Sequence, residues 1–327
     1  MALTGDMLWH DLLWQQALTD GGGSHDFAPQ LEALSPATEA DLAVAHQEVP
    51  VGEPDGPFEN YPAVVVPPQT LDGLRRVGFH AITTASNHSM DGGHVGLGRT
   101  LDAADRAGLA HAGTARSAEE QATPSIVTTA SGVRIGLVAG AYGLNGYRLD
   151  RDKQWAWNGL DPDLMAADAA RCRAAGADLV IAAVHAGVEY QTEPTSQQRE
   201  VAHRLAESPD IDLVYGHHAH AVQPWEDHNG TWILYGLGNA MAAQSTKEPR
   251  TREGAIARIT FRHDPTAGWW LAHAAYVPTL IQARPWRVYP LGAPEVSHRH
   301  RVEVGERTYR AITSWGAAGI YPVLHGL

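Results

Sequence analysis

Short apolar runs alternate with amphipathic stretches through the first two-thirds of the chain. Five runs have strand length and predict buried strands, at residues 43–45, 81–83, 135–138, 179–184 and 211–215. Four stretches between them carry apolar residues at three- and four-residue spacing, which predicts helices, at residues 69–77, 96–107, 161–174 and 195–207. This alternation predicts a sheet with helices packed against it.

The last third of the chain follows a different pattern. Three apolar runs, at residues 231–235, 254–261 and 269–277, follow one another without an amphipathic stretch between them, which predicts consecutive strands. Together the two parts of the chain suggest two sheets with helices outside. Loop-like segments lie at about 20–26, 50–68 and 142–160, and an extension begins at about 291. Because motifs on both sides of the loops point to one site, we expect a single domain over residues 1–327.

Charge and cysteine content narrow the classes of function. The 24 basic and 37 acidic residues give a net charge of −13, which disfavours nucleic acid and anionic membranes as partners. Cys172 is the single cysteine, so an intramolecular disulfide and a cysteine-based metal site are excluded. Asp6 and Asp11 interrupt the first dozen residues, where a signal peptide would need a basic start and an apolar stretch. We therefore expect a cytoplasmic protein.

Histidines gather at the predicted strand ends. The chain has 18 of them. His185 ends the most apolar run, and His217, His218 and His220 follow the next. The two-residue spacing of His218 and His220 places both imidazoles on one side of an extended turn, where they can bind one ion or an adjacent pair. A lone histidine here would more often be a core or surface residue, but the repeated placement predicts a metal site.

Acidic and amide side chains follow the earlier strands. Asp6 and Glu48 each come after a short apolar run, and Asn87 follows another. Asn87 can bind a metal through its amide oxygen, His88 can act as an acid or base, and Asp91 can orient that imidazole. Taken alone, Asp6 would more often cap a helix, and an Asn/Gly-rich turn would more often only reverse the chain.

As an ordered set, these motifs resemble those of the CapA (poly-γ-glutamate capsule synthesis) family, which is similar to the calcineurin-like metallophosphoesterases. The set also includes His111-Ala112-Gly113 and Tyr235-Gly236-Leu237-Gly238-Asn239. The resemblance implies an α/β protein with a four-layer α/β/β/α sandwich. It also implies one or two divalent ions, calcium or manganese before zinc or iron, and no organic cofactor. The implied metal ligands are Asp6, Glu48, Asn87, His185, His218 and His220, and His88 is the implied acid/base.

One departure from the family pattern concerns the segment Trp9-His10-Asp11. It places an acid where the family usually has an arginine. An aspartate there repels phosphate and adds a base, so His10 and Asp11 join the His88–Asp91 pair as candidate catalytic groups. The alternative for Asp11 is a solvated acid in the first turn of a helix.

Two bases beside a metal suggest removal and return of a proton at a carbon next to a carbonyl. In this respect the chain resembles the peptide epimerases of lasso-peptide biosynthesis. The resemblance implies inversion of Cα at the C-terminal residue, expected to be tryptophan, of a ribosomal precursor peptide. The candidate substrate-binding residues are Trp9, His46, Arg148, Trp155 and His217.

Two alternatives stay open. The first is a metal-dependent phosphoesterase or a capsule-type amide hydrolase or ligase, and the missing arginine argues against phosphate chemistry. The second is a non-catalytic binding module on the same scaffold. That alternative requires lost ligands, whereas all six ligand positions keep a coordinating side chain.

Overall fold

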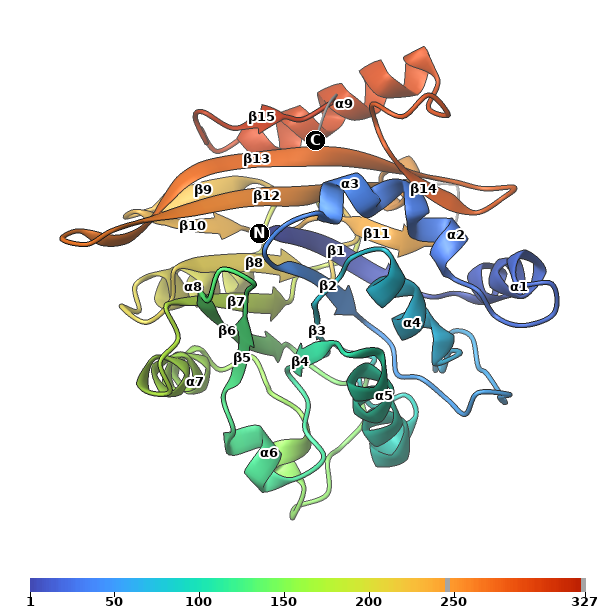
Figure 1. Ribbon diagram of the computed structural model, residues 1–327, viewed down its shortest axis with the longest axis horizontal. Helices are drawn as coiled ribbons and strands as arrows, with labels where there is room; N and C mark the ends of the chain where they lie inside the picture. Colours follow the sequence, from blue (N-terminus) through green and yellow to red (C-terminus); the bar gives the residue numbers. More distant parts are fainter. Residues whose placement is uncertain (245–247, 325–327) are drawn as a thin grey trace.

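A computed structural model describes residues 1–244 and 248–324 (Figure 1). Within these residues, the first sheet has the order β14-β13-β12-β1-β2-β3-β4, with β11 paired to β1 and β15 to β13. Its strands are β1 (Ala2–Leu8), β2 (Ala43–Gln47), β3 (Ala81–Thr83), β4 (Ala110–Ala112), β11 (Asn239–Ala242), β12 (Glu253–Asp264), β13 (Gly268–Gln282), β14 (Arg287–Pro290) and β15 (Tyr321–Pro322). The strands β1 to β4 run parallel to one another.

The second sheet has the order β5-β6-β7-β8-β10-β9 among the described residues. Its strands are β5 (Ser125–Thr128), β6 (Arg134–Ala141), β7 (Leu179–His185), β8 (Leu213–His217), β9 (Trp225–His228) and β10 (Thr231–Leu234). The three central strands β6, β7 and β8 are parallel. Their carboxyl ends therefore lie at one edge of the sheet, as those of β1 to β4 do in the first sheet.

Helices cover the outer faces of both sheets. Those of the first half are α1 (Asp11–Asp20), α2 (Ala28–Leu31), α3 (Ser35–Thr38), α4 (Gln69–Arg76), α5 (Gly93–Ala107) and α6 (Ala118–Ala122), and those of the second are α7 (Pro162–Ala174), α8 (Ser196–Ala206) and α9 (His298–Thr313). Short 3-10 helices lie at η1 (Glu32–Leu34), η2 (Gln154–Ala156) and η3 (Pro249–Arg252). Apolar residues of α1 to α5 share a core with the first sheet, and those of α7 and α8 share one with the second.

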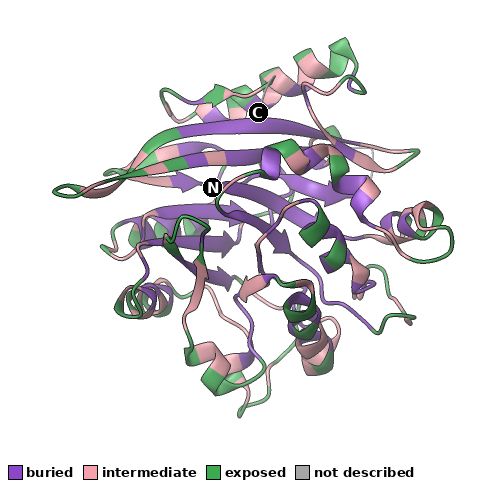
Figure 2. Cartoon of the chain, viewed as in Figure 1, coloured by how far each residue is buried: buried purple, intermediate pink, exposed green. Residues whose placement is uncertain are grey.

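The two-residue period of the strands sets the layers. In β7, Leu179, Ile181 and Ala183 face a core shared by both sheets. Val180, Ala182 and Val184 face the core beneath α7 and α8. A strand that is buried on both faces needs a continuous run of apolar residues. The strands are indeed buried along most of their length (Figure 2). The expected four-layer α/β/β/α sandwich is confirmed.

The predicted elements are all present, with bounds shifted by a few residues. The largest shift at a strand start is in β8, which begins at Leu213 instead of 211. The extension expected from about 291 folds as β15 and α9, which lies along β13 (Figure 1). Ile312 of α9 and Ile320 contribute to the core between the sheets. The extension is therefore part of the sandwich, which its mostly polar sequence did not predict.

Candidate metal centre

The candidate ligands converge where the carboxyl ends of the parallel strands meet. Asp6 lies in β1, Glu48 follows β2, His185 ends β7, and His218 and His220 follow β8. Asn87 follows β3. All six residues are buried, and none is more than 3% exposed. Residues up to 214 positions apart thus form one cluster, as the strand-end positions predicted.

Asp6 and His220 form the innermost pair of this cluster. The Nδ1 atom of His220 lies 3.0 Å from Oδ2 of Asp6. The backbone N–H of His218 also donates to the Asp6 carboxylate, at 3.2 Å and 3.3 Å. Burial by itself raises the pKa of Asp6, but the hydrogen bond and charge of His220 hold that pKa well below its usual range. Asp6 is therefore an ionised carboxylate that hydrogen bonds hold in place.

The environment of Glu48 shifts its pKa in the opposite direction. Both of its carboxylate oxygens are buried without a hydrogen-bond partner. The nearest cationic atom is Nε2 of His220, 3.7 Å from Oε1. Burial raises the pKa of Glu48 to about 7. A buried carboxylate without a partner is costly, so this position calls for a cation.

Glu48 belongs to two groups of three residues that meet the geometric requirement for holding an ion. In each group, one donor atom from each side chain lies within 4.8 Å of the others. The first group is Asp6, Glu48 and His220, and the second is Glu48, His185 and His218. Because the groups share a carboxylate with two oxygens, they can hold either one ion or a bridged pair.

The imidazoles supply further unpartnered donors. The Nδ1 atoms of His185 and His218 are buried without a hydrogen-bond partner. Burial lowers the pKa of both rings, that of His218 to about 4, so both are neutral and have lone pairs for a metal. Asn87 turns its Oδ1 toward Nε2 of His185, at 2.8 Å. This donor set fits a divalent ion and would hold it through imidazole nitrogens and carboxylate and amide oxygens.

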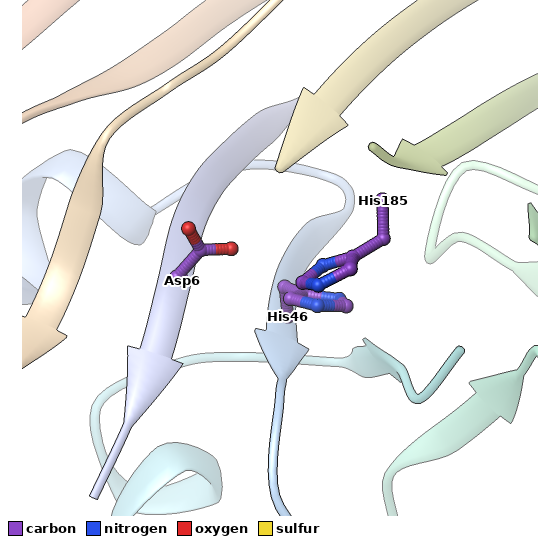
Figure 3. A group of neighbouring side chains, drawn as sticks. All are labelled: Asp6, His46 and His185. Carbon is purple, nitrogen blue, oxygen red and sulfur yellow. The ribbon is translucent and has the colours of Figure 1, made fainter. Parts of the chain in front are cut away.

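His46 and His217 form the inner wall of the centre. Their rings stack with centroids 4.0 Å apart, and the ring of His185 lies 4.8 Å from that of His46. Figure 3 shows His46 and His185 beside Asp6. Asp6, His46 and His185 also form a group with donor atoms within 4.8 Å of one another. His46 and His217 are each 1% exposed, so they are as buried as the candidate ligands, and their contact with a substrate stays a prediction.

His88 and Asp91 form the predicted pair. The His88 Nδ1 atom lies 2.6 Å from Oδ2 of Asp91. That oxygen also accepts a hydrogen bond from the backbone N–H of Val64, at 2.7 Å, so the 50–68 loop fixes its position. Burial lowers the pKa of His88, but the hydrogen bond and charge of Asp91 and the charge of Glu48 raise it by more. With Nδ1 engaged, Nε2 is the atom that can exchange a proton with a substrate.

The segment 9–11 lies differently from the expectation. Trp9 is fully buried, packs against Phe27 with ring centroids 5.1 Å apart, and donates to Oε1 of Gln47. The ring thus belongs to the core under α1, and its expected contact with substrate stays a prediction. Asp11 is the first residue of α1, and its Oδ1 accepts from the N–H of Leu12. This is the first-turn position that was the alternative for Asp11.

His10 is the N-cap residue of α1 and directly precedes Asp11. Its Nδ1 accepts from the backbone N–H of Ala243, at 3.2 Å. Burial lowers the pKa of His10 to about 4, and the charges of His220 and His88 also act on that pKa. His10 is thus a half-buried imidazole four residues beyond Asp6 in the chain.

The two remaining candidates lie in the 142–160 loop. Arg148 is exposed. Trp155 packs beside Met90, Leu97 and Leu101, and its Nε1 donates to the carbonyl of Asp152. The structure thus ties Trp155 to α5, and its role in substrate binding stays a prediction, as does that of Arg148.

Backbone geometry limits which residues fit at positions around the ligands. A Cβ on Gly5 would lie 1.9 Å from the carbonyl oxygen of Gly238, so glycine is required where β1 passes this segment. His218 and His220 adopt φ angles of 84° and 50°, which are unusual for residues other than glycine. Such conformations cost about 1–3 kcal/mol each and persist where a functional arrangement holds them.

Three residues of the site were not predicted. Asn239, at the start of β11, places Oδ1 2.9 Å from Nδ1 of His220. Asn145 accepts a hydrogen bond from Asn87, and the ring of Tyr142 packs against that of His218 with centroids 4.6 Å apart and an interplanar angle of 43°. Asn239 lay within a recognised motif, which could have drawn attention to it. Asn145 and Tyr142 had no signal, because their positions depend on the course of a loop.

The family profile described as bacterial capsule synthesis protein PGA_cap matches residues 1–244. The chain belongs to the PGA_cap family. It is 28% identical over 201 residues to the PGA biosynthesis protein CapA of Bacillus subtilis, covering 61% of this chain and 51% of that protein. It is 27% identical over 216 residues to a probable polyglutamine synthesis accessory protein of Mycobacterium tuberculosis, covering 62% and 56%. This PGA_cap chain thus spans about half the length of the curated relatives it matches.

Among solved structures, the PGA_cap chain is similar to the calcineurin-like phosphoesterase YfkN of Bacillus subtilis. The TM-score is 0.47 at 14% identity, covering 96% of this chain and 98% of that one. A putative 5'-nucleotidase from Staphylococcus aureus gives a TM-score of 0.49 at 14% identity, covering 93% and 58%. Across residues 1–244 and 248–324, no helix combines the length and apolar character needed to cross a membrane.

Proposed function

We propose that this PGA_cap chain is a metal-dependent hydrolase that cleaves amide bonds in a glutamate-containing polymer. The observation that carries the proposal is the His88–Asp91 pair, which adjoins a buried centre with unpartnered metal donors. The names of the relatives supply the substrate class, since they refer to capsule and polyglutamine synthesis.

Different residues of the centre have different roles in such a reaction. A divalent ion, when bound, polarises the scissile carbonyl and lowers the pKa of a water molecule. Asp6, Glu48, Asn87, His185, His218 and His220 would hold it. Three candidate imidazole ligands favour manganese, iron or zinc over calcium, which prefers oxygen donors. His88 donates a proton from Nε2 to the leaving amine, and Asp91 keeps its ring in the required orientation.

A cavity that connects to the centre through hydrogen bonds supports an anionic substrate. Its volume is 810 Å³, and its walls include Arg252, Arg284 and Trp286. Arg252 lies over the ring of Trp286, 5.3 Å from its centroid, and its buried Nε has no hydrogen-bond partner. Gln244, also in the wall, accepts from Nδ2 of Asn239, the residue that contacts His220. Two guanidinium groups here suit the carboxylates of such a polymer, although the chain as a whole is acidic.

The test is release of amino groups from γ-linked polyglutamate, with and without a chelator. We expect metal-dependent release, and a fall in kcat of about 100- to 10,000-fold in His88→Ala. Metal content should stay unchanged in that variant. His298→Ala, at an exposed position on α9, is the matched control. Release that persists in His88→Ala, or in the presence of chelator, would contradict the proposal, and release of phosphate from a phosphoester instead would favour the phosphoesterase.

The peptide epimerase is the second candidate, and the position of His10 favours it. The imidazole of His10 follows β1, the strand that carries Asp6, and Asp11 comes next, so two further acid/base groups follow a ligand-bearing strand. The test uses a tryptophan-ended ribosomal precursor peptide in D2O. Mass gain of one dalton at the terminal residue, lost in Asp11→Asn and on chelation, would support this function over hydrolysis. An unchanged mass would leave hydrolysis as the reaction.

A further inference from the structure

A second group of histidine and glutamate side chains lies on the outer face of the second sheet. It consists of His203 on α8 and of Glu226 and His228 on β9, and is called the edge cluster here because β9 is an edge strand. None of its residues belongs to the metal centre at the strand ends. The three side chains are 33%, 24% and 17% exposed, so an ion can reach them from solvent.

The donor atoms of the edge cluster already converge. One atom from each residue lies within 4.8 Å of the other two. Oε2 of Glu226 lies 3.0 Å from Nε2 of His203, and Oε1 lies 3.7 Å from Nδ1 of His228. The two imidazole rings are stacked, with centroids 4.0 Å apart and an interplanar angle of 14°. Each carboxylate oxygen of Glu226 thus faces a ring nitrogen. Small side-chain rotations therefore suffice to bring the three donor atoms to one ion.

Outer partners orient the donors, as in many metal sites. Nε2 of His228 lies 3.4 Å from Oε1 of Glu207, so a proton on Nε2 leaves the Nδ1 lone pair directed at the cluster. The hydroxyl of Tyr235 donates to Oε2 of Glu226, at 2.7 Å. Burial raises the pKa of Glu226, but the hydrogen bonds from Tyr235 and His203 lower it by more, which keeps the carboxylate ionised. When an ion replaces the proton that Nε2 of His203 shares with Glu226, the charged carboxylate and the two imidazoles form a ligand set of the kind that binds zinc.

We propose that the edge cluster binds one first-row divalent ion, zinc in preference to magnesium or calcium, through His203, Glu226 and His228. The ion would connect α8 to the edge strand β9. A solvent molecule completes its coordination, since the site is open on the outer face. This proposal does not depend on the function of the strand-end centre, because the two sites share no residue.

The experiment compares zinc stoichiometry between matched variants after equilibrium dialysis against zinc chloride. The wild-type protein is compared with His203→Gln, His228→Gln and the control His298→Gln, and bound zinc is measured by elemental analysis. Zinc at the strand-end centre contributes equally to all four proteins, so it cancels in the difference. We expect each cluster variant to bind one equivalent less than the wild type, and the control to bind the same amount.

A second measurement covers the case in which a cluster variant folds poorly. Glu207 is 61% exposed at its side chain, so Glu207→Gln should fold normally. Loss of an outer partner typically weakens metal binding by a factor of about 10–100, and we expect the zinc affinity of this site to fall by about tenfold. Equal stoichiometry in wild type, His203→Gln and His228→Gln, together with an unchanged affinity in Glu207→Gln, would overturn the proposal and leave the edge cluster a hydrogen-bonded network.

Discussion

The strand-end centre and the edge cluster use the same residue types in opposite ways. In the centre, both oxygens of Glu48 and the Nδ1 atoms of His185 and His218 are buried without partners. In the edge cluster, Oε2 of Glu226 has hydrogen-bond partners, and the side chains are 17–33% exposed. The centre is thus incomplete without a cation, whereas the edge cluster is stable with or without one.

The difference follows from how each site is built. The centre combines the carboxyl ends of strands from both sheets and tolerates unusual φ angles at His218 and His220. The edge cluster places side chains of one helix and one edge strand over a solvent-facing surface. Buried charges without partners cost far more than exposed ones, so the two sites should respond differently to mutation and to chelation.

The largest difference is expected for His220→Ala in metal-free protein. This change removes the cationic partner of Asp6 and leaves two buried carboxylates side by side. Breaking a buried pair in this way typically costs about 3–5 kcal/mol, and we expect a loss of that size in the free energy of unfolding. Urea denaturation measures it, with His298→Ala as the control. A loss below about 1 kcal/mol would show that water already compensates these carboxylates.

The second difference concerns metal addition to the wild-type protein. At a metal concentration 100 times the Kd, binding to the folded state alone stabilises a protein by about 2.7 kcal/mol. We expect a gain of this size from the strand-end centre, seen as a higher Tm. Glu48→Gln removes the shared carboxylate and should abolish most of the gain. If Glu48→Gln responds to metal as the wild type does, Glu48 is not a ligand.

Much of the strand-end centre could be predicted from the sequence. In β7 and β8, apolar residues alternate so that His185 and His217 fall on the face between the sheets, with Ile181 and Leu213. The period of two therefore predicts that both imidazoles point into the molecule. The strand-end positions of Asp6, Glu48 and Asn87 predicted their convergence for the same reason.

Other features depend on contacts that no local pattern encodes. Trp9 follows an apolar strand and could equally face a substrate or the core; its burial results from packing against Phe27. Asn239 reaches His220 because β11 pairs with β1, across more than 200 residues. The edge cluster arises because α8 packs beside β9 and β10, which brings His203 to Glu226. In each case, contacts between elements that are distant in the sequence determine where the side chain lies.

The smallest effect is expected for Glu226→Gln in metal-free protein. The glutamine keeps the shape of the side chain and can still accept from the Tyr235 hydroxyl, so only the charge is lost. Partly exposed pairs contribute about 0–1 kcal/mol, and we expect the free energy of unfolding to fall by no more than that. Urea denaturation of Glu226→Gln beside His220→Ala makes the comparison directly. A loss of about 3 kcal/mol in Glu226→Gln would mean that the edge cluster, despite its exposure, is as dependent on its charges as the buried centre, and the contrast between the two sites would fail.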